Sequence, residues 1–220
     1  MIKAILFDLD NTLIDFWRFK RKCIDAAIDS MILCGLGMKK DKARKMIYKI
    51  YKQHGIEDQK IFQKFLRKAK GRVDYKILTC GVLAYRKSKA KYMTPYEGVV
   101  ETLKKLKRKY KLAIISDAPA MNAWTRLLAM KIDKFFKIVI TKSDVKSQKP
   151  SSKIFHVALK KLKVRPEQAI MVGDRVERDI KGAKALGIKT VFARYGNPAV
   201  KKSGADWEIR NIKELVGVVQ

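Results

Sequence analysis

Five short apolar runs that alternate with helical patterns constrain the fold of this chain more than any other feature of its sequence. The runs occupy residues 1–7, 111–118, 136–141, 168–174 and 188–194. The later four are near-continuous Ile, Val and Ala segments without polar alternation, as is typical of parallel strands covered by helices on both faces. The alternation predicts an α/β fold with a doubly wound, Rossmann-like parallel sheet, whose ligands bind beyond the carboxyl ends of the strands.

Apolar residues at helical spacing separate these runs and predict the helices that cover the sheet. The four patterns consist of Val99, Val100, Leu103 and Leu106; Trp124, Leu127 and Leu128; Phe155, Ala158, Leu159 and Leu162; and Ile180, Ala183 and Leu186.

Residues 15–92 interrupt this order, because they contain amphipathic helical stretches and no convincing strand. The stretches lie near residues 17–33, 39–53, 58–70 and 72–91. Glycines in "CGLGM", "HGIED" and "KGRVD" stand where these helices would end. The sequence therefore predicts a Rossmann-like core formed by residues 1–14 and 93–220, with an all-helical domain inserted at residues 15–92.

The charge balance favours anionic partners. The chain has 220 residues, and its 51 Lys and Arg against 21 Asp and Glu give a net charge of +30. Residues 15–92 hold 22 of the basic and 7 of the acidic side chains. Such a charge attracts small phosphorylated substrates or nucleic acid, and a Lys-rich surface is also typical of thermophilic proteins. We favour a small phosphorylated substrate, because no nucleic-acid-reading motif accompanies the charge.

Localisation and redox state are predicted from what the sequence lacks. No apolar run reaches membrane-spanning length and no leader pattern precedes the first strand, so we expect a cytoplasmic protein without a membrane partner. The cysteines at 23, 34 and 80 are odd in number and lack close spacing, which predicts reduced thiols that serve a structural role. Nothing in the sequence indicates an oligomeric state.

Two carboxylates follow the first apolar run. Asp8 and Asp10 are two residues apart, so an extended chain places them on one side as neighbours. Two close carboxylates repel each other and raise one pKa, so the arrangement is costly unless a cation is bound or one carboxyl keeps its proton. The alternative is a solvated turn in which Asp10 and Asn11 supply side-chain acceptors.

Other polar residues follow the later runs. Ser116 ends the second run, Lys149 precedes Pro150 after the third, and Asp174 and Asp179 follow the fourth in "VGDRVERD". Taken singly, each has an ordinary interpretation as a helix cap, a solvated lysine or an acidic first helical turn. Together they would meet at the carboxyl edge of one sheet, which favours a single site.

These segments resemble the four motifs of the haloacid dehalogenase superfamily of phosphatases. The resemblance rests on "DLDNT", Ser116, Lys149 with Pro150, and "GDRVERD", and it covers nearly the whole chain. The helical insertion resembles the cap domain of the subgroup that includes phosphoglycolate phosphatases and β-phosphoglucomutase. The resemblance implies a magnesium-dependent phosphatase that hydrolyses a small phosphorylated metabolite.

The resemblance also implies roles for individual residues. Asp8 would be the nucleophile that becomes an aspartyl phosphate, and Asp10 the general acid and base. Mg²⁺ would be held by the Asp8 side chain, the Asp10 carbonyl and Asp174, with Asp179 behind them. Further expected roles are phosphoryl binding by Ser116 and Lys149, loop or phosphate contacts by Asn11 and Thr12, and substrate-facing positions at Trp17 and Arg18.

Three other functions remain open from the sequence. A phosphomutase would pass the phosphoryl group to a second hydroxyl instead of water. A 2-haloacid dehalogenase would use the same nucleophile, but related dehalogenases usually lack an acid at the position of Asp10. A basic nucleic-acid-binding protein on this scaffold is the least favoured of the three.

Overall fold

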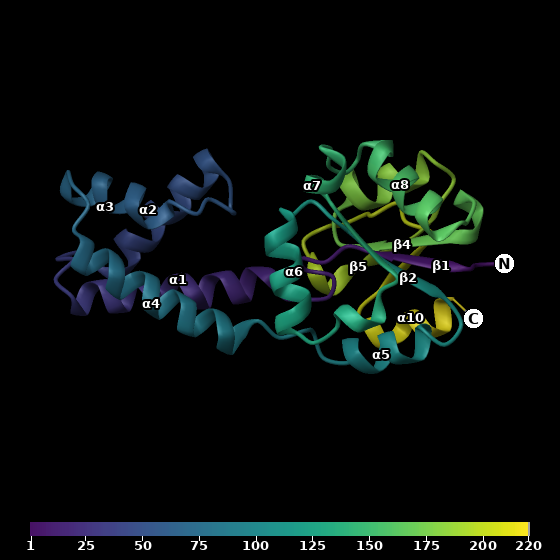
Figure 1. Ribbon diagram of the computed structural model, residues 1–220, viewed down its shortest axis with the longest axis horizontal. Helices are drawn as coiled ribbons and strands as arrows, with labels where there is room; N and C mark the ends of the chain where they lie inside the picture. Colours follow the sequence, from purple (N-terminus) through teal and green to yellow (C-terminus); the bar gives the residue numbers. More distant parts are fainter. Residues whose placement is uncertain (220) are drawn as a thin grey trace. The chain divides into compact units, whose positions relative to one another are not determined.

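Two compact units make up the chain. The computed structural model describes residues 1–219 and separates Met1–Phe16 together with the chain from Thr94 onward from a second unit, Trp17–Met93. The first unit contains the sheet and the second is helical (Figure 1). Each is described by itself below.

The sheet unit is built on six parallel strands, which confirms the predicted fold class. The strands are β1 (Ala4–Phe7), β2 (Lys111–Ser116), β3 (Ile138–Thr141), β4 (Ala169–Gly173), β5 (Lys189–Ala193) and β6 (Trp207–Ile209). Their order is β3-β2-β1-β4-β5-β6, so the first strand lies at the centre between β2 and β4. The edge strand β6 was not predicted from the sequence.

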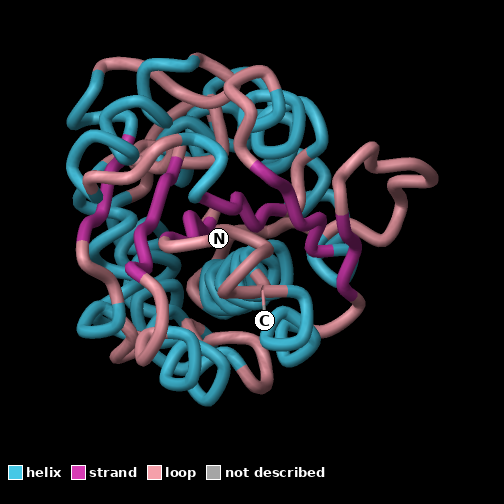
Figure 2. Tube along the Cα trace, turned by 90° about the vertical axis from the view of Figure 1, so that its right-hand side faces the viewer, coloured by secondary structure: helices cyan, strands magenta, loops and turns pink. Residues whose placement is uncertain are grey.

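Helices cover both faces of this sheet, as the doubly wound prediction requires. Figure 1 shows α8 on one side of the strands and α5 with α10 on the other, and Figure 2 shows the strands running through the middle of the unit. The helices are α5 (Val99–Leu106), α6 (Ala120–Ala129), α7 (Lys142–Val145), α8 (Ser152–Leu162), α9 (Lys181–Lys184) and α10 (Leu215–Val218). Shorter helical turns are η1 (Asp133–Phe135), η2 (Pro166–Gln168), η3 (Val176–Ile180), η4 (Arg194–Gly196) and η5 (Ile212–Glu214).

Alternation along the strands divides the core between the two faces. Ala4 and Leu6 of β1 belong to a buried cluster with Phe155 and Ala158 of α8. Ile5 and Phe7, equally buried, therefore point to the opposite face. Burying one large apolar side chain contributes about 1.5–3 kcal/mol, so this two-sided burial holds the centre of the sheet firmly.

Not every apolar residue of the predicted patterns in α5 and α6 is buried. Val100, Trp124 and Leu128 are exposed. On α6 the buried residues are Ala123, Arg126 and Leu127. The helix is rotated relative to the apolar pattern, and an arginine occupies a position on its buried face.

The second unit consists of four helices around their own core. They are α1 (Phe16–Leu33), whose first residue belongs to the sheet unit, α2 (Lys40–His54), α3 (Ile61–Lys70) and α4 (Tyr75–Tyr92). All four contribute to one buried cluster, with Ile28, Ile47, Phe65 and Ile77 among its members. Within residues 1–219, no helix is long and apolar enough to cross a membrane.

The prediction of reduced cysteines is wrong for two of the three. Cys34, just after α1, is disulfide-bonded to Cys80 in α4, across a sequence separation of 46 residues. Cys23 is a free, buried thiol. The same two helices approach closely at Gly81, where an added Cβ would lie 2.0 Å from the Met31 Cε atom. Glycine at this position therefore allows the contact between α1 and α4.

Candidate active site

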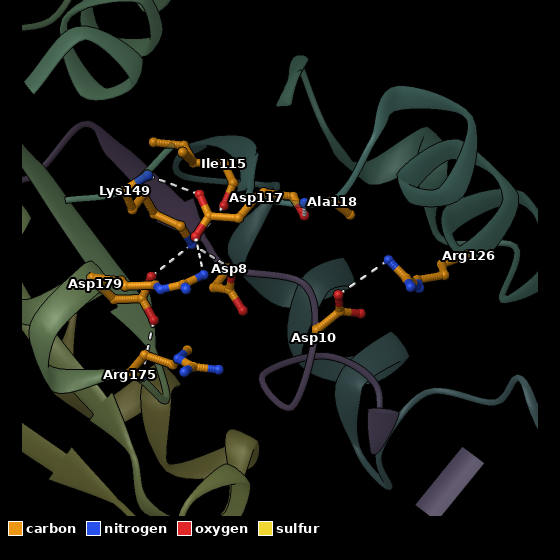
Figure 3. A network of polar contacts seen from close by, with 11 residues as sticks. Asp8, Asp10, Ile115, Asp117, Ala118, Arg126, Lys149, Arg175 and Asp179 are labelled. Carbon is orange, nitrogen blue, oxygen red and sulfur yellow. Dashed lines mark hydrogen bonds and ion pairs between the residues drawn. The ribbon is translucent and has the colours of Figure 1, made fainter. Parts of the chain in front are cut away.

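The polar residues predicted from the sequence meet at the carboxyl edge of the central strands. Asp8 follows β1, Ser116 ends β2 and Asp174 follows β4, and all three are buried. Because β1 lies between β2 and β4, adjacent parallel strands deliver these side chains to one place. Figure 3 shows the network around Asp8.

Lys149 is the cation at the centre of this network. Its side chain is 1% exposed, and its ammonium forms ion pairs with Asp8 and with Asp179 Oδ1, the latter at 2.6 Å. The third partner is the carbonyl oxygen of Ile115, at 3.0 Å. The Lys149 backbone N–H donates to Asp117 Oδ1 at 2.8 Å, which fixes the loop that carries it. The ammonium therefore has two hydrogen-bond acceptors, Asp8 and the Ile115 carbonyl, and the nearby Asp179 carboxylate adds a second ion pair.

Asp179 is held from behind by its own loop. Its Oδ2 atom accepts a hydrogen bond from the Arg175 backbone N–H at 3.0 Å, within the turn that contains η3. Gly173 makes this approach feasible, since a Cβ there would lie 2.3 Å from Asp179 Oδ2. Asp179 can therefore aim its other oxygen at Lys149.

Several carboxyl groups surround one ammonium group in this site, and they shift one another's pKa values. Burial raises the pKa of Asp8 well above its ordinary value; the Lys149 ammonium opposes that rise, and the charges of Asp179 and Asp174 add to it. Burial likewise raises the pKa of Asp174 to about 7, with Asp179 adding to the effect. Burial alone would lower the pKa of Lys149, but Asp179 and Asp8 outweigh it, so the ammonium stays charged. A second cation would favour ionised carboxylates.

The donor set fits a hard divalent cation. Asp8, Asp174 and Asp179 each offer a carboxylate oxygen, and these atoms lie within 4.8 Å of one another. Asp174 Oδ1 is buried and has no hydrogen-bond partner among residues 1–219. Buried carboxylate oxygens that need a positive partner suit Mg²⁺, which prefers oxygen ligands.

Asp10 differs from the expectation that four carboxylates converge. Its side chain does not join the cluster of three, and its Oδ2 atom lies 3.1 Å from an amino nitrogen of Arg126. The chain turns at Asn11, which has φ 60° and whose backbone N–H donates to the Ile14 carbonyl at 2.7 Å. Strand β1 has already ended at Phe7, so strand alternation does not set the directions of the Asp8 and Asp10 side chains, although the Asp10 charge still adds to the raised pKa of Asp8.

The remaining predicted residues occupy defined positions around the cluster. The Ser116 hydroxyl oxygen accepts from the Ala118 backbone N–H at 3.1 Å. Thr12 is buried, and its carbonyl accepts from the Tyr195 hydroxyl at 2.7 Å. Trp17 and Arg18 have exposed side chains in the first turns of α1, within the helical unit, and their expected contact with substrate stays a prediction.

Three residues of the site were not found from the sequence. Asp117 carries the Lys149 loop and also accepts from Arg178 at 3.0 Å. Tyr195 supports the loop after β1, and Arg126 contacts Asp10. The signal for Asp117 was its place directly after Ser116, and the signal for Arg126 was its helical spacing from Ala123; neither distinguishes them from surface residues.

Comparison with known proteins identifies the family. Residues 5–193 match the family described as haloacid dehalogenase-like hydrolase. The chain is 36% identical to the glyceraldehyde 3-phosphate phosphatase of Pyrococcus furiosus and 35% identical to that of Methanocaldococcus jannaschii. Both alignments cover all of this chain, with 93% and 98% of the relatives.

A solved structure agrees with the sequence comparisons. The crystal structure of a HAD phosphatase from Thermococcus onnurineus is 28% identical, covers 99% of this chain with 98% of its own, and has a TM-score of 0.71. The motifs, the sheet order and these similarities agree, and the chain belongs to the family of haloacid dehalogenase-like hydrolases.

Proposed function

We propose that this chain is a magnesium-dependent phosphatase that hydrolyses a small phosphorylated metabolite through an aspartyl phosphate on Asp8. The observation that carries the proposal is the buried Lys149 ammonium, paired with Asp8 and Asp179 beside the unsatisfied Asp174 oxygen. A nucleophile beside a fixed ammonium and a carboxylate set that can hold a divalent cation is what transfer of an anionic phosphoryl group needs.

The first step forms the phosphoenzyme. An Asp8 carboxylate oxygen attacks the phosphorus, and the bond from phosphorus to the leaving oxygen breaks. The electron pair stays on the leaving oxygen, which takes a proton from Asp10. Ser116 and Lys149 contact the phosphoryl oxygens and offset their charge, while Asp179 keeps the Lys149 ammonium in place.

The second step returns the enzyme to its starting state. A water oxygen attacks the phosphorus while Asp10 takes the proton of that water, and the bond from phosphorus to Asp8 breaks. Inorganic phosphate leaves, and Asp8 regains its carboxylate. Mg²⁺, held by the Asp8 carboxylate, the Asp10 carbonyl and Asp174, would supply charge neutralisation and keep Asp8 ionised despite burial.

Glyceraldehyde 3-phosphate is the substrate to test first. Full-length relatives at 36% and 35% identity carry that activity in their names. Such a substrate is small and anionic, and it therefore suits a chain of net charge +30. Glyceraldehyde 3-phosphate is also an alkyl phosphate monoester, so its leaving oxygen needs a proton. Asp10 is the residue that would supply this proton.

The test is a phosphate-release screen over glyceraldehyde 3-phosphate, pyrophosphate, phosphoglycolate, hexose phosphates and an aryl phosphate. Each is assayed with magnesium and with excess EDTA, alongside Asp8→Asn. We expect release that requires both magnesium and Asp8. Chloride release from 2-chloropropionate, phosphoryl transfer between sugar hydroxyls, or salt-sensitive DNA binding without any phosphate release would contradict the proposal in favour of one alternative.

A further inference from the structure

Arg126 is unusual among the basic residues of this chain. Among residues 1–219 it is the one buried arginine, and its side chain is 4% exposed. It lies on α6, the helix that follows β2 and Ser116, on the face that also buries Ala123 and Leu127. Burying a guanidinium is costly unless a carboxylate and well-formed contacts compensate it. The contacts of Arg126 should therefore show why a charge is buried here.

Two of its contacts show where the guanidinium lies. One amino nitrogen lies 3.1 Å from Asp10 Oδ2, and the guanidinium carbon lies 4.7 Å from the centre of the Phe16 ring. Figure 3 shows the Arg126 side chain extending from its helix to Asp10. A planar guanidinium between a carboxylate oxygen and an aromatic face has little freedom to turn.

Phe16 gives this arrangement a fixed support. Its side chain is buried, and it is the last residue of the sheet unit before the chain enters the helical unit. The segment just before it is tied to the sheet unit by a bridge between Ile14 and Pro95. Arg126 therefore stacks on a buried residue of the sheet unit, and this contact limits how far its guanidinium can move away from Asp10.

We propose that Arg126 is the positioning residue of the general acid and base, holding the Asp10 carboxylate through one oxygen against a stack with Phe16. The inference rests on the proposed phosphatase function. Arg126 does not touch substrate in this scheme; it restricts the rotation of Asp10 so that the carboxyl can serve the leaving oxygen and then the water. A misplacement of about 1 Å can cost roughly 100-fold in rate.

The dependence on the leaving group distinguishes positioning from support of the fold. An alkyl phosphate such as glyceraldehyde 3-phosphate needs a proton on its leaving oxygen, whereas an activated aryl phosphate needs far less. If Arg126 positions the acid, its loss should reduce turnover of the alkyl ester more than formation of the phosphoenzyme from the aryl ester. Damage to folding would lower both equally.

The experiment compares wild type, Arg126→Met and Arg126→Lys, with Thr125→Ala as a control on the exposed side of the same helix. In Arg126→Met we expect kcat for the alkyl ester to fall about 10- to 100-fold, and aspartyl phosphate on Asp8 to accumulate with the aryl ester. Arg126→Lys should lie between this variant and wild type. Thr125→Ala should match wild type.

Phe16→Leu provides a second variant in case Arg126→Met does not fold. It keeps an apolar side chain but removes the ring under the guanidinium, and it should shift the same ratio in the same direction. An unchanged ratio of alkyl-ester turnover to phosphoenzyme formation from the aryl ester in folded variants, or a ratio that rises, would overturn the inference while leaving the phosphatase proposal intact. A wild type that hydrolyses neither ester would overturn both.

Discussion

Replacing Lys149 by Met tests how the buried carboxylates are held in place. The ammonium pairs with Asp8 and with Asp179 at 2.6 Å, and its side chain is 1% exposed. Two unit charges about 4 Å apart interact by about 4 kcal/mol at an effective dielectric constant of 20. Removing one member of a buried ion pair costs about 3–5 kcal/mol, because the remaining charge stays buried and uncompensated. Methionine preserves the aliphatic stem, so the loss is chiefly electrostatic.

The assay is thermal unfolding at pH 7.5 in EDTA, followed by circular dichroism. We expect Lys149→Met to lower the melting temperature of the sheet unit by roughly 10 °C. Lys213→Met is the matched control, since it removes the same group from an exposed ion pair with Glu97, and exposed pairs contribute little. If Lys149→Met melts at the temperature of wild type in the absence of metal, the ammonium does not hold the carboxylates together and our reasoning is wrong.

Three further predictions concern the disulfide, the metal and acid stability. Replacing Cys34 and Cys80 by Ser should lower the unfolding free energy of the helical unit by about 4 kcal/mol, the chain-entropy value for a loop of this length. Wild type under reducing conditions should have the same melting temperature as this variant. Magnesium should raise the wild-type melting temperature with the logarithm of its concentration once that exceeds the dissociation constant, and Asp174→Asn should abolish that rise. Burial opposes ionisation of Asp206, but hydrogen bonds from Thr190 hold the pKa of Asp206 below its ordinary value. Asp206→Ala should therefore lower the unfolding free energy by about 1 kcal/mol at pH 7. This difference from wild type should disappear as the pH falls from the ordinary aspartate pKa through the lower pKa of folded Asp206.

The strands and helices were accessible from the sequence because their signals are local. Runs such as residues 111–118 and 168–174 are apolar without polar alternation, and this pattern is typical of strands that are buried on both faces. Strand β6 escaped because it has three residues, and two of them, Trp207 and Glu208, are exposed. Pairing with β5 defines it, and a pairing of that kind leaves no periodic pattern in so short a segment.

The parts of the site that were missed depend on tertiary placement. Arg126 looks like one more surface cation among 51 Lys and Arg, and only the rotation of α6 reveals that it is buried. The Cys34–Cys80 bond joins positions 46 residues apart, so the count of three cysteines could not indicate it. Asp10 was placed beside Asp8 by strand alternation, but β1 ends at Phe7, and the Asp10 carboxylate forms an ion pair with Arg126.

The most direct test of the central claim is whether Asp8 becomes phosphorylated. Asp10→Asn keeps the nucleophile but removes the base that activates water, a loss of about 10²- to 10⁴-fold. After this variant is mixed with an aryl phosphate and magnesium, mass spectrometry should find one phosphoryl group on the peptide that contains Asp8, and none in a variant that also carries Asp8→Asn. If wild type hydrolyses the ester while no phosphoryl group reaches Asp8 in either background, water attacks phosphorus directly and the assigned roles of both carboxylates are wrong.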